Sequence, residues 1–328
     1  MKKYLPLLIA VMLVFTMTVS AAAEENIAIV FATGGLGDQS FNDAAYRGIQ
    51  TAEEELGINY DYAEPGAVAD YDNYLEQFAA TGRYDLIISI GFDQADALEE
   101  ISARYPEQNF ALVDAALDAD NVASYVYQEK ERGFLMGAAA AMTTARTEDY
   151  DHLNEEKHLG VIGGMEIPLI NANIAGFIAG AEYIDEEVEV SYSYVGAWDD
   201  PGSGKELAVS LHEDDADIIW AAAGRSGLGA IEAAEENDFY VIGSDDDQSY
   251  LAPDHVLTNG MKYVDNTVFL AVEQLQENRF EPGVHNLGVA EEALGYTETM
   301  LAEDVVEKLE EIKADIAAGE IEVPETIE

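Results

Sequence analysis

The stretch Ile27-Ala-Ile-Val-Phe-Ala-Thr-Gly-Gly-Leu-Gly-Asp-Gln-Ser-Phe-Asn42 decides the fold class, because it joins an apolar run to a glycine-rich turn and then to a helix. Residues 27–32 are typical of a buried strand. The helix that begins near Asn42 carries apolar side chains at Ala45, Ile49, Ala52 and Leu56, one helical face, and Gly57 ends it. A strand, a glycine turn and a helix in this order form the first half of a β-α-β unit.

The same alternation continues along the chain and restarts near residue 158, after a polar and charged break at 146–157. Strands are expected at 58–63, 85–91, 110–114, 122–127, 159–163, 188–195, 217–223, 239–243, 256–261 and 284–289, and helices at 71–81, 94–105, 133–145, 168–184, 203–213, 228–237, 264–277 and 302–318. This alternation predicts the α/β class, with parallel sheets flanked by helices. The restart predicts two lobes of this kind.

The first 23 residues have the pattern of a signal peptide. Lys2 and Lys3 precede an apolar core at 5–19, and small residues at 21–23 offer a cleavage site. We therefore expect an exported protein that works outside the cytoplasmic membrane. An uncleaved segment that stays as a membrane anchor is the alternative.

The chain has an unusually large negative net charge. Its 328 residues include 15 Lys and Arg against 66 Asp and Glu, a formal net charge of −51, and no cysteine. The missing cysteine excludes disulfides, thiolate metal sites and a lipidated N-terminal cysteine. A polyanion of this kind repels phosphate backbones, so we expect no nucleic-acid partner. Because the acid is spread over the whole chain and salt screens such repulsion, we infer a halophilic source, with an acidic exported protein at low salt as the alternative.

Candidate ligand groups follow the predicted strands, because parallel β-α-β units place binding sites at the carboxyl ends of strands. Phe41 lies in the first glycine-rich loop, where Asn42 can cap the helix, and Trp198 follows a strand of the second half. Two aromatic rings from facing lobes would sandwich a flat ligand ring. Alternatively, the Phe41 ring packs over the sheet, and Trp198 lies at the edge of the hydrophobic core.

Asp114, Asp245 and Lys262 also fall at predicted strand ends. A carboxylate there can accept two sugar hydroxyls, although a turn cap or an ion pair explains these residues about as well. The five histidines, at positions 152, 158, 212, 255 and 285, have no ligand spacing. We therefore expect no cofactor, no metal centre and no catalytic machinery.

An ordered set of short motifs gives the chain a family resemblance. The motifs are at 37–42 (GDQSFN), 84–92 (YDLIISIGF), 121–124 (NVAS), 163–168 (GGMEIP), 175–180 (AGFIAG), 222–229 (AAGRSGLG), 243–248 (GSDDDQ), 261–265 (MKYVD) and 319–324 (GEIEVP). Together they resemble the basic membrane protein family of ABC-transporter substrate-binding proteins, which includes purine-nucleoside receptors. The resemblance implies a type I periplasmic-binding-protein fold with hinge strands. The lobes would span 24–150 plus about 258–285, and 151–257 plus about 286–328.

The resemblance also implies roles for individual residues. Phe41 and Trp198 look like the pair that stacks on a nucleobase, with Trp198 where a Phe is more usual, and Asp245 and Lys262 look like the ribose contacts. The other implied binding residues are Thr33, Asp38, Asn42, Asp114 and Gly224. An Asp often ends the first strand of the family, whereas this chain has Ala32.

The resemblance implies a monomer that binds a nucleoside, with purine favoured, by hinge closure, and that delivers it to an ABC permease. The alternatives are a ligand sensor for a signalling receptor, a binding protein for another flat ligand such as riboflavin, and an enzyme on the same fold, such as a nucleosidase.

Overall fold

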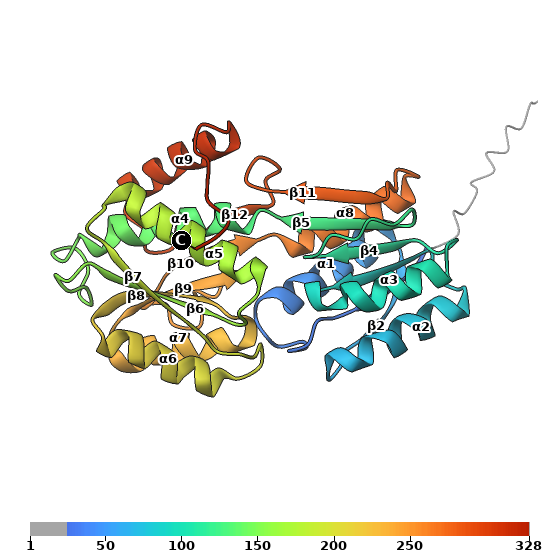
Figure 1. Ribbon diagram of the computed structural model, residues 1–328, viewed down its shortest axis with the longest axis horizontal. Coiled ribbons are helices and arrows are strands. Elements are labelled where there is room, and N and C mark those ends of the chain that lie inside the picture. The colour runs from blue at the N-terminus through green and yellow to red at the C-terminus, as the bar shows by residue number, and fades with distance from the viewer. Residues whose placement is uncertain (1–24, 328) are drawn as a thin grey trace, which may run out of the picture.

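The computed structural model describes residues 25–327, and the predicted signal peptide at 1–23 lies outside them. The described chain folds into two lobes, each built on a six-stranded sheet with helices on its faces (Figure 1). This arrangement confirms the predicted α/β fold of two sheets flanked by helices. Within residues 25–327 there is no helix long and apolar enough to cross a membrane.

The first lobe has the strand order β11-β5-β4-β3-β1-β2, and all its paired strands are parallel. Its central strands are buried along their whole length because helices cover both faces of a parallel sheet. The elements are β1 (Asn26–Val30), α1 (Phe41–Leu56), β2 (Asn59–Ala63), α2 (Tyr71–Thr81), β3 (Leu86–Ile90), α3 (Ala95–Arg104), β4 (Phe110–Val113), β5 (Val122–Tyr127), α8 (Val264–Gln276) and β11 (Gly283–Leu287).

The second lobe repeats the arrangement in the order β12-β10-β9-β8-β6-β7. Its elements are α4 (Glu129–Thr144), β6 (His158–Gly163), α5 (Pro168–Ile184), β7 (Glu189–Tyr194), α6 (Pro201–Glu213), β8 (Ala216–Ala222), α7 (Gly227–Asn237), β9 (Tyr240–Asp245), β10 (Val256–Lys262), β12 (Leu294–Tyr296) and α9 (Glu303–Ala317). The strand β12 is antiparallel to β10 and so departs from the expected parallel pattern. Three residues are too few for a sequence period, and the segment was not predicted.

Helix α4 belongs to the second lobe because it packs closely on α5. A Cβ atom on Gly133 would lie 2.1 Å from the carbonyl oxygen of Asn173, and one on Gly180 would lie 2.0 Å from that of Phe134, so only glycine permits this approach. The chain therefore crosses between the lobes after β5, between β10 and α8, and between β11 and β12.

These crossings differ from the boundaries near residues 150 and 258 that the sequence analysis placed. An alanine-rich helix has no sequence signal for the lobe on which it packs. The charged break at 146–157 therefore lies within the second lobe, and β10 completes the second sheet.

Candidate functional site

A cavity lies between the lobes at the carboxyl ends of strands from both sheets, and the space between its walls is about 640 Å³, open water included. All the binding residues expected from the sequence line it: Thr33, Asp38, Phe41, Asn42, Asp114, Trp198, Gly224, Asp245 and Lys262. The wall also contains Ala32, Gly34, Gly91, Phe92, Asp93, Arg132, Leu169, Ile170, Ala222 and Arg225. The fold thus brings together residues that lie more than two hundred positions apart in the chain.

The loop before α1 holds Phe41 through two buried polar side chains. The carboxylate of Asp38 accepts hydrogen bonds from the backbone N–H groups of Ser40 (3.0 Å), Asn42 (2.8 Å) and Asp43 (3.1 Å). The Asn42 side chain donates to Asp38 (3.0 Å) and accepts from the N–H of Ala32 (2.9 Å). Asp38 and Asn42 therefore position the loop and the Phe41 ring.

The expectation that Asn42 caps the helix is wrong, because α1 already begins at Phe41 and Asn42 is a helical residue. The free N–H groups of the first turn are instead satisfied by Asp38, which lies before the helix. Burial raises the pKa of Asp38 to about 6, and the hydrogen bonds from Asn42, Asp43 and Ser40 limit the rise.

Trp198 reaches the cavity from the loop after β7 and depends on two glycines. A Cβ atom on Gly164 would lie 2.3 Å from Cζ3 of the indole, so the ring lies directly on the backbone of Gly164. Gly34 of the first lobe packs against the Trp198 Cβ, and a Cβ on Gly34 would lie 3.6 Å from it. The backbone of Trp198 is held by Ser226, whose N–H donates to the Trp198 carbonyl (3.0 Å). Phe41 and Trp198 thus face one cavity from different lobes.

A buried network of charges forms the floor of the cavity. The Nζ atom of Lys262 lies 2.9 Å from Asp114 Oδ2 and 2.5 Å from Glu129 Oε1. Arg132 lies 2.8 Å from Glu129 Oε2 and 2.5 Å from Asp245 Oδ1. We call these five residues the hinge network, because Glu129 and Lys262 lie at crossings between the lobes.

The charges of the hinge network do not cancel. Its carboxylates outnumber its cations, since Asp114, Glu129 and Asp245 face only Arg132 and Lys262. Burial raises the pKa of Asp114 to about 6, which the attraction of Lys262 only partly offsets. Burial also acts to raise the pKa of Asp245, but the attraction of Arg132 and Lys262 outweighs it and leaves that pKa lowered. The floor of the cavity therefore favours hydrogen-bond donors over anions.

Asp114 and Asp245 occupy equivalent places at strand ends of the two lobes. Both have left-handed backbone conformations, with φ of 73° and 69°. This conformation is costly for residues other than glycine and is concentrated at functional sites. It turns each carboxylate from the end of its strand into the space between the lobes.

Asp93, which was not among the expected binding residues, lines the same cavity. Its Oδ2 atom accepts hydrogen bonds from the hydroxyls of Thr33 (3.1 Å) and Tyr71 (3.0 Å). Its Oδ1 atom and the Ala32 side chain both lie next to Gly91, since a Cβ on Gly91 would be 3.1 Å from Asp93 Oδ1 and 3.0 Å from Ala32 Cβ. Burial raises the pKa of Asp93, against the lowering effect of the bonds from Tyr71 and Thr33. The sequence feature that could have indicated Asp93 is its position two residues after Gly91, which ends a predicted strand.

Glu129 and Arg132 were also missed, because the sequence analysis began their helix only at Gly133. Both are nearly inaccessible to solvent, at 3% and 2% exposure, although charged residues are seldom buried. Their spacing of three residues, directly before a long apolar helix, is the signal that points to a buried ion pair.

The two lobes touch each other around the cavity. The Ser40 hydroxyl lies 2.6 Å from Asp245 Oδ2, and the Gln248 side chain donates to the Gln39 carbonyl (3.0 Å). Arg47 of α1 lies 2.6 Å from Asp246 of the second lobe. These contacts describe a closed arrangement, in which a ligand in the cavity is surrounded by both lobes.

Known proteins share this architecture and sequence. The family described as "ABC transporter substrate-binding protein PnrA-like" matches residues 25–327. The chain belongs to this family. It is 31% identical over 301 residues to basic membrane protein A of Borreliella burgdorferi, covering 89% of this chain and 85% of that protein. It is 30% identical over 293 residues to a protein of Pyrococcus abyssi named as an uncharacterized lipoprotein, covering 86% of this chain and 71% of that protein.

A crystal structure of an ABC transporter system solute-binding protein from Aeropyrum pernix K1 superposes with a TM-score of 0.83 at 30% identity, covering 92% of this chain and 94% of that one. The PnrA-like family and the type I binding-protein fold predicted from the sequence motifs are therefore confirmed. Members of the family are substrate-binding proteins of ABC transporters, and relatives named as lipoproteins are consistent with a location outside the cytoplasm.

Proposed function

We propose that this PnrA-like protein binds a nucleoside between its lobes and delivers it to an ABC permease. The observation that carries the proposal is the pairing of Phe41 and Trp198, from different lobes, in one cavity with carboxylates at strand ends. A nucleoside presents a flat ring to stack and vicinal hydroxyls to donate hydrogen bonds. Base stacking on an aromatic side chain contributes about 1–3 kcal/mol.

The ribose would lie over the hinge network. Asp245 and Asp114 already accept bonds from protein partners, yet each carboxylate has about four lone-pair sites and can accept from hydroxyls as well. The Nζ atom of Lys262 lies 5.0 Å from the centre of the Phe41 ring and 2.9 Å from Asp114, so it is close to both the stacking group and a carboxylate. We assign Asp245, Asp114 and Lys262 to the sugar, and the backbone of Gly224 to the nearby wall.

The base edge would meet Asp93. This carboxylate lines the same cavity as Ala32, the position at which the family often has an Asp, and both lie next to Gly91. Its Oδ1 atom can accept hydrogen bonds from N–H groups of the ring. A purine such as guanine or hypoxanthine presents such a group, whereas a plain sugar does not. Asp93 therefore supports retention of base recognition despite the change at position 32.

The charge of the cavity favours a ligand without phosphate. Arg132 and Lys262 are already paired within the hinge network, and Asp93 and Asp38 add further carboxylates to the wall. Arg225 is an exposed cation at this wall, and a phosphate would have to reach it past those acids. A nucleoside monophosphate should therefore bind more weakly than the matching nucleoside.

We also propose that the protein is exported. In salt-rich surroundings, ions would screen the repulsion between its surface carboxylates and so stabilise the fold. The proposal also includes a monomeric receptor that closes on its ligand. A role as sensor for a signalling receptor is the second candidate, since the same closure could be recognised by either partner. Genes for a permease and an ATPase next to this gene favour transport, and a gene for a sensor kinase favours signalling.

A thermal-shift screen tests the proposal, with the chain from residue 24 onward in about 1 M salt, where the Debye length is roughly 3 Å. The ligands are adenosine, guanosine, inosine, uridine, guanosine monophosphate, free bases, riboflavin, galactose and amino acids. A ligand at 100 times its Kd should add about 2.7 kcal/mol of stability. A shift with nucleosides alone supports the proposal. A shift with riboflavin or galactose and none with nucleosides overturns it, and release of free base from a nucleoside would indicate an enzyme.

A further inference from the structure

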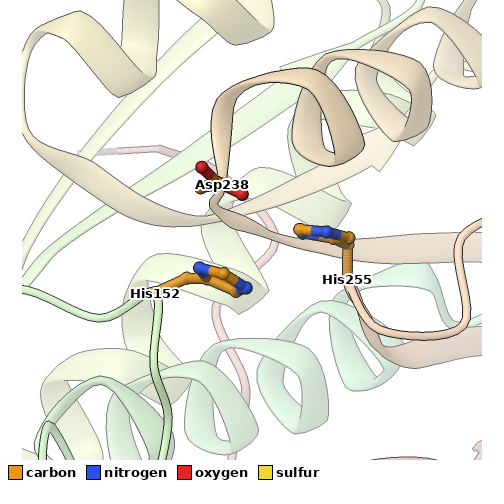
Figure 2. A group of neighbouring side chains, drawn as sticks. All are labelled: His152, Asp238 and His255. Carbon is orange, nitrogen blue, oxygen red and sulfur yellow. The ribbon is translucent and has the colours of Figure 1, made fainter.

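Two of the five histidines come together with an aspartate in the second lobe, far from the ligand cavity. The ligand atoms of His152, Asp238 and His255 all lie within 4.8 Å of one another. Figure 2 shows the three side chains directed toward a common space from three separate segments. No sequence motif points to this group, because its members are 86 and 17 positions apart.

The fold places the group at the amino ends of two neighbouring strands. Asp238 directly follows α7, where its left-handed backbone (φ 59°) ends the helix, and His255 directly precedes β10. His152 lies in the connection between α4 and β6. The cavity lies at the other ends of these strands, beyond Asp245. Asp238 and Asp245 are seven positions apart along mostly extended chain, a span of roughly 20 Å.

His255 is prepared for metal coordination by its own hydrogen bond. Its Nδ1 atom lies 3.0 Å from the carbonyl oxygen of Phe239. A carbonyl only accepts, so Nδ1 carries the proton and the lone pair is on Nε2. A ring whose second nitrogen is held in this way is the usual arrangement of a metal-binding histidine.

His152 and Asp238 lie close enough to His255 to bind the same ion. The Tyr240 ring packs against the His152 imidazole, with centroids 5.3 Å apart and planes 54° from parallel, and so supports the segment that carries His152. Asp238 is exposed and His152 half-buried, so both side chains can turn.

The two imidazole rings are stacked, with centroids 4.9 Å apart and planes 17° from parallel. An ion must lie near the plane of each imidazole that it binds, so one ring has to rotate. His152 is the ring with room to do so. Bonds of about 2.0–2.2 Å to zinc would bring the ligand atoms to roughly 3.3 Å from one another.

We infer that His152, Asp238 and His255 form a binding site for a divalent metal ion of the zinc class, with a fourth position left for water. Imidazole nitrogen with one carboxylate oxygen suits zinc, nickel, copper or cobalt, whereas magnesium and calcium prefer all-oxygen sites. The ion would fasten the charged segment 146–157 to β9 and β10. This site is independent of the proposed nucleoside binding.

Zinc titration of the metal-free chain, with a competing chromophoric chelator and in about 1 M KCl, tests the inference. We expect one tight equivalent, an increase in the unfolding midpoint on zinc addition, and no displacement by excess magnesium. His152→Ala and Asp238→Asn should each weaken zinc binding at least tenfold and remove the increase in the midpoint. His285→Ala, a histidine of the first lobe, is the matched control and should bind zinc like the parent chain.

A spectroscopic arm separates this site from zinc held by surface carboxylates. Cobalt(II) should give the intense visible absorption of a four-coordinate ion, and His152→Ala should abolish it. His255 is buried, so loss of binding in His255→Ala counts only if that variant keeps the parent circular dichroism. Absence of a tight equivalent overturns the inference, as does equal zinc affinity in the parent, His152→Ala and Asp238→Asn chains. Nucleoside affinity should be the same with and without zinc.

Discussion

Replacing Gly164 by alanine should weaken ligand binding without touching the ligand. The new Cβ atom would lie 2.3 Å and 2.4 Å from Cζ3 and Cε3 of Trp198. Ordinary contact between carbon atoms is about 3.5 Å, so the ring must move by roughly 1.2 Å. Trp198 is half-buried and can move, so we expect the stability of the fold to change little.

The size of the effect follows from overpacking. A displaced ring crowds the cavity, and an extra methyl group in a well-packed site costs about 1–3 kcal/mol. If this cost falls on the bound state, Kd rises roughly 5- to 150-fold, since about 1.4 kcal/mol is a factor of ten. Isothermal titration with guanosine and inosine measures it. Gly66→Ala is the matched control, because the nearest atom to its Cβ would be 3.8 Å away.

A double-mutant cycle makes the reasoning specific to Trp198. Trp198→Ala removes both the stack and the obstacle, so Gly164→Ala should have almost no further effect in that background. Additive losses would mean that Gly164 acts through other neighbours. Parent affinity in Gly164→Ala, with unchanged unfolding, would refute the placement of Trp198 against the ligand.

Four more outcomes are expected. Nucleoside affinity should fall as the pH is lowered through the raised pKa values of Asp93 and Asp114, since hydrogen-bond donors of the ligand need the ionised carboxylates. Asp93→Asn should therefore lose less affinity than the parent over the same pH range. Lys262→Met should destabilise the chain by about 3–5 kcal/mol in chemical unfolding, because Asp114 and Glu129 would lose their buried cation, and an unchanged midpoint would contradict this. Ser40→Ala removes a 2.6 Å bond between the lobes, so X-ray scattering of the ligand-free variant should give a larger radius of gyration than the parent. The unfolding midpoint should increase between about 10 mM and 1 M salt, where the Debye length shortens from roughly 30 to 3 Å, and a flat salt dependence would count against halophilic adaptation.

The sequence predicted most of the fold because its signals are local. Helices α2 (Tyr71–Thr81) and α5 (Pro168–Ile184) have the predicted bounds, since Gly82 marks the end of the first and Pro168 the start of the second. The expected binding residues share one cavity because parallel strands bring their carboxyl ends to one edge.

What the sequence could not give depends on packing between distant segments. The lobe that holds α4 is decided by glycines of α4 and α5, each of which lies against the backbone of the other helix, and single glycines have many other uses. Arg132 ends an ordinary charged stretch at 129–132 in the sequence, yet it is buried between Glu129 and Asp245 and lies 5.6 Å from the centre of the Trp220 ring. Only the folded chain shows which carboxylates form ion pairs with Arg132.

The hinge network links the acidity of the chain to its mechanism of closure. A chain of 66 acids and 15 basic residues can exchange a surface cation for a carboxylate wherever salt screens the repulsion. It cannot do so at Lys262 and Arg132, because a buried carboxylate without its partner is costly. These two cations hold Asp114 of the first lobe and Asp245 of the second to elements at the crossings. A ligand that donates to both carboxylates would therefore bind to groups that already join the lobes, and its binding energy would act directly on closure.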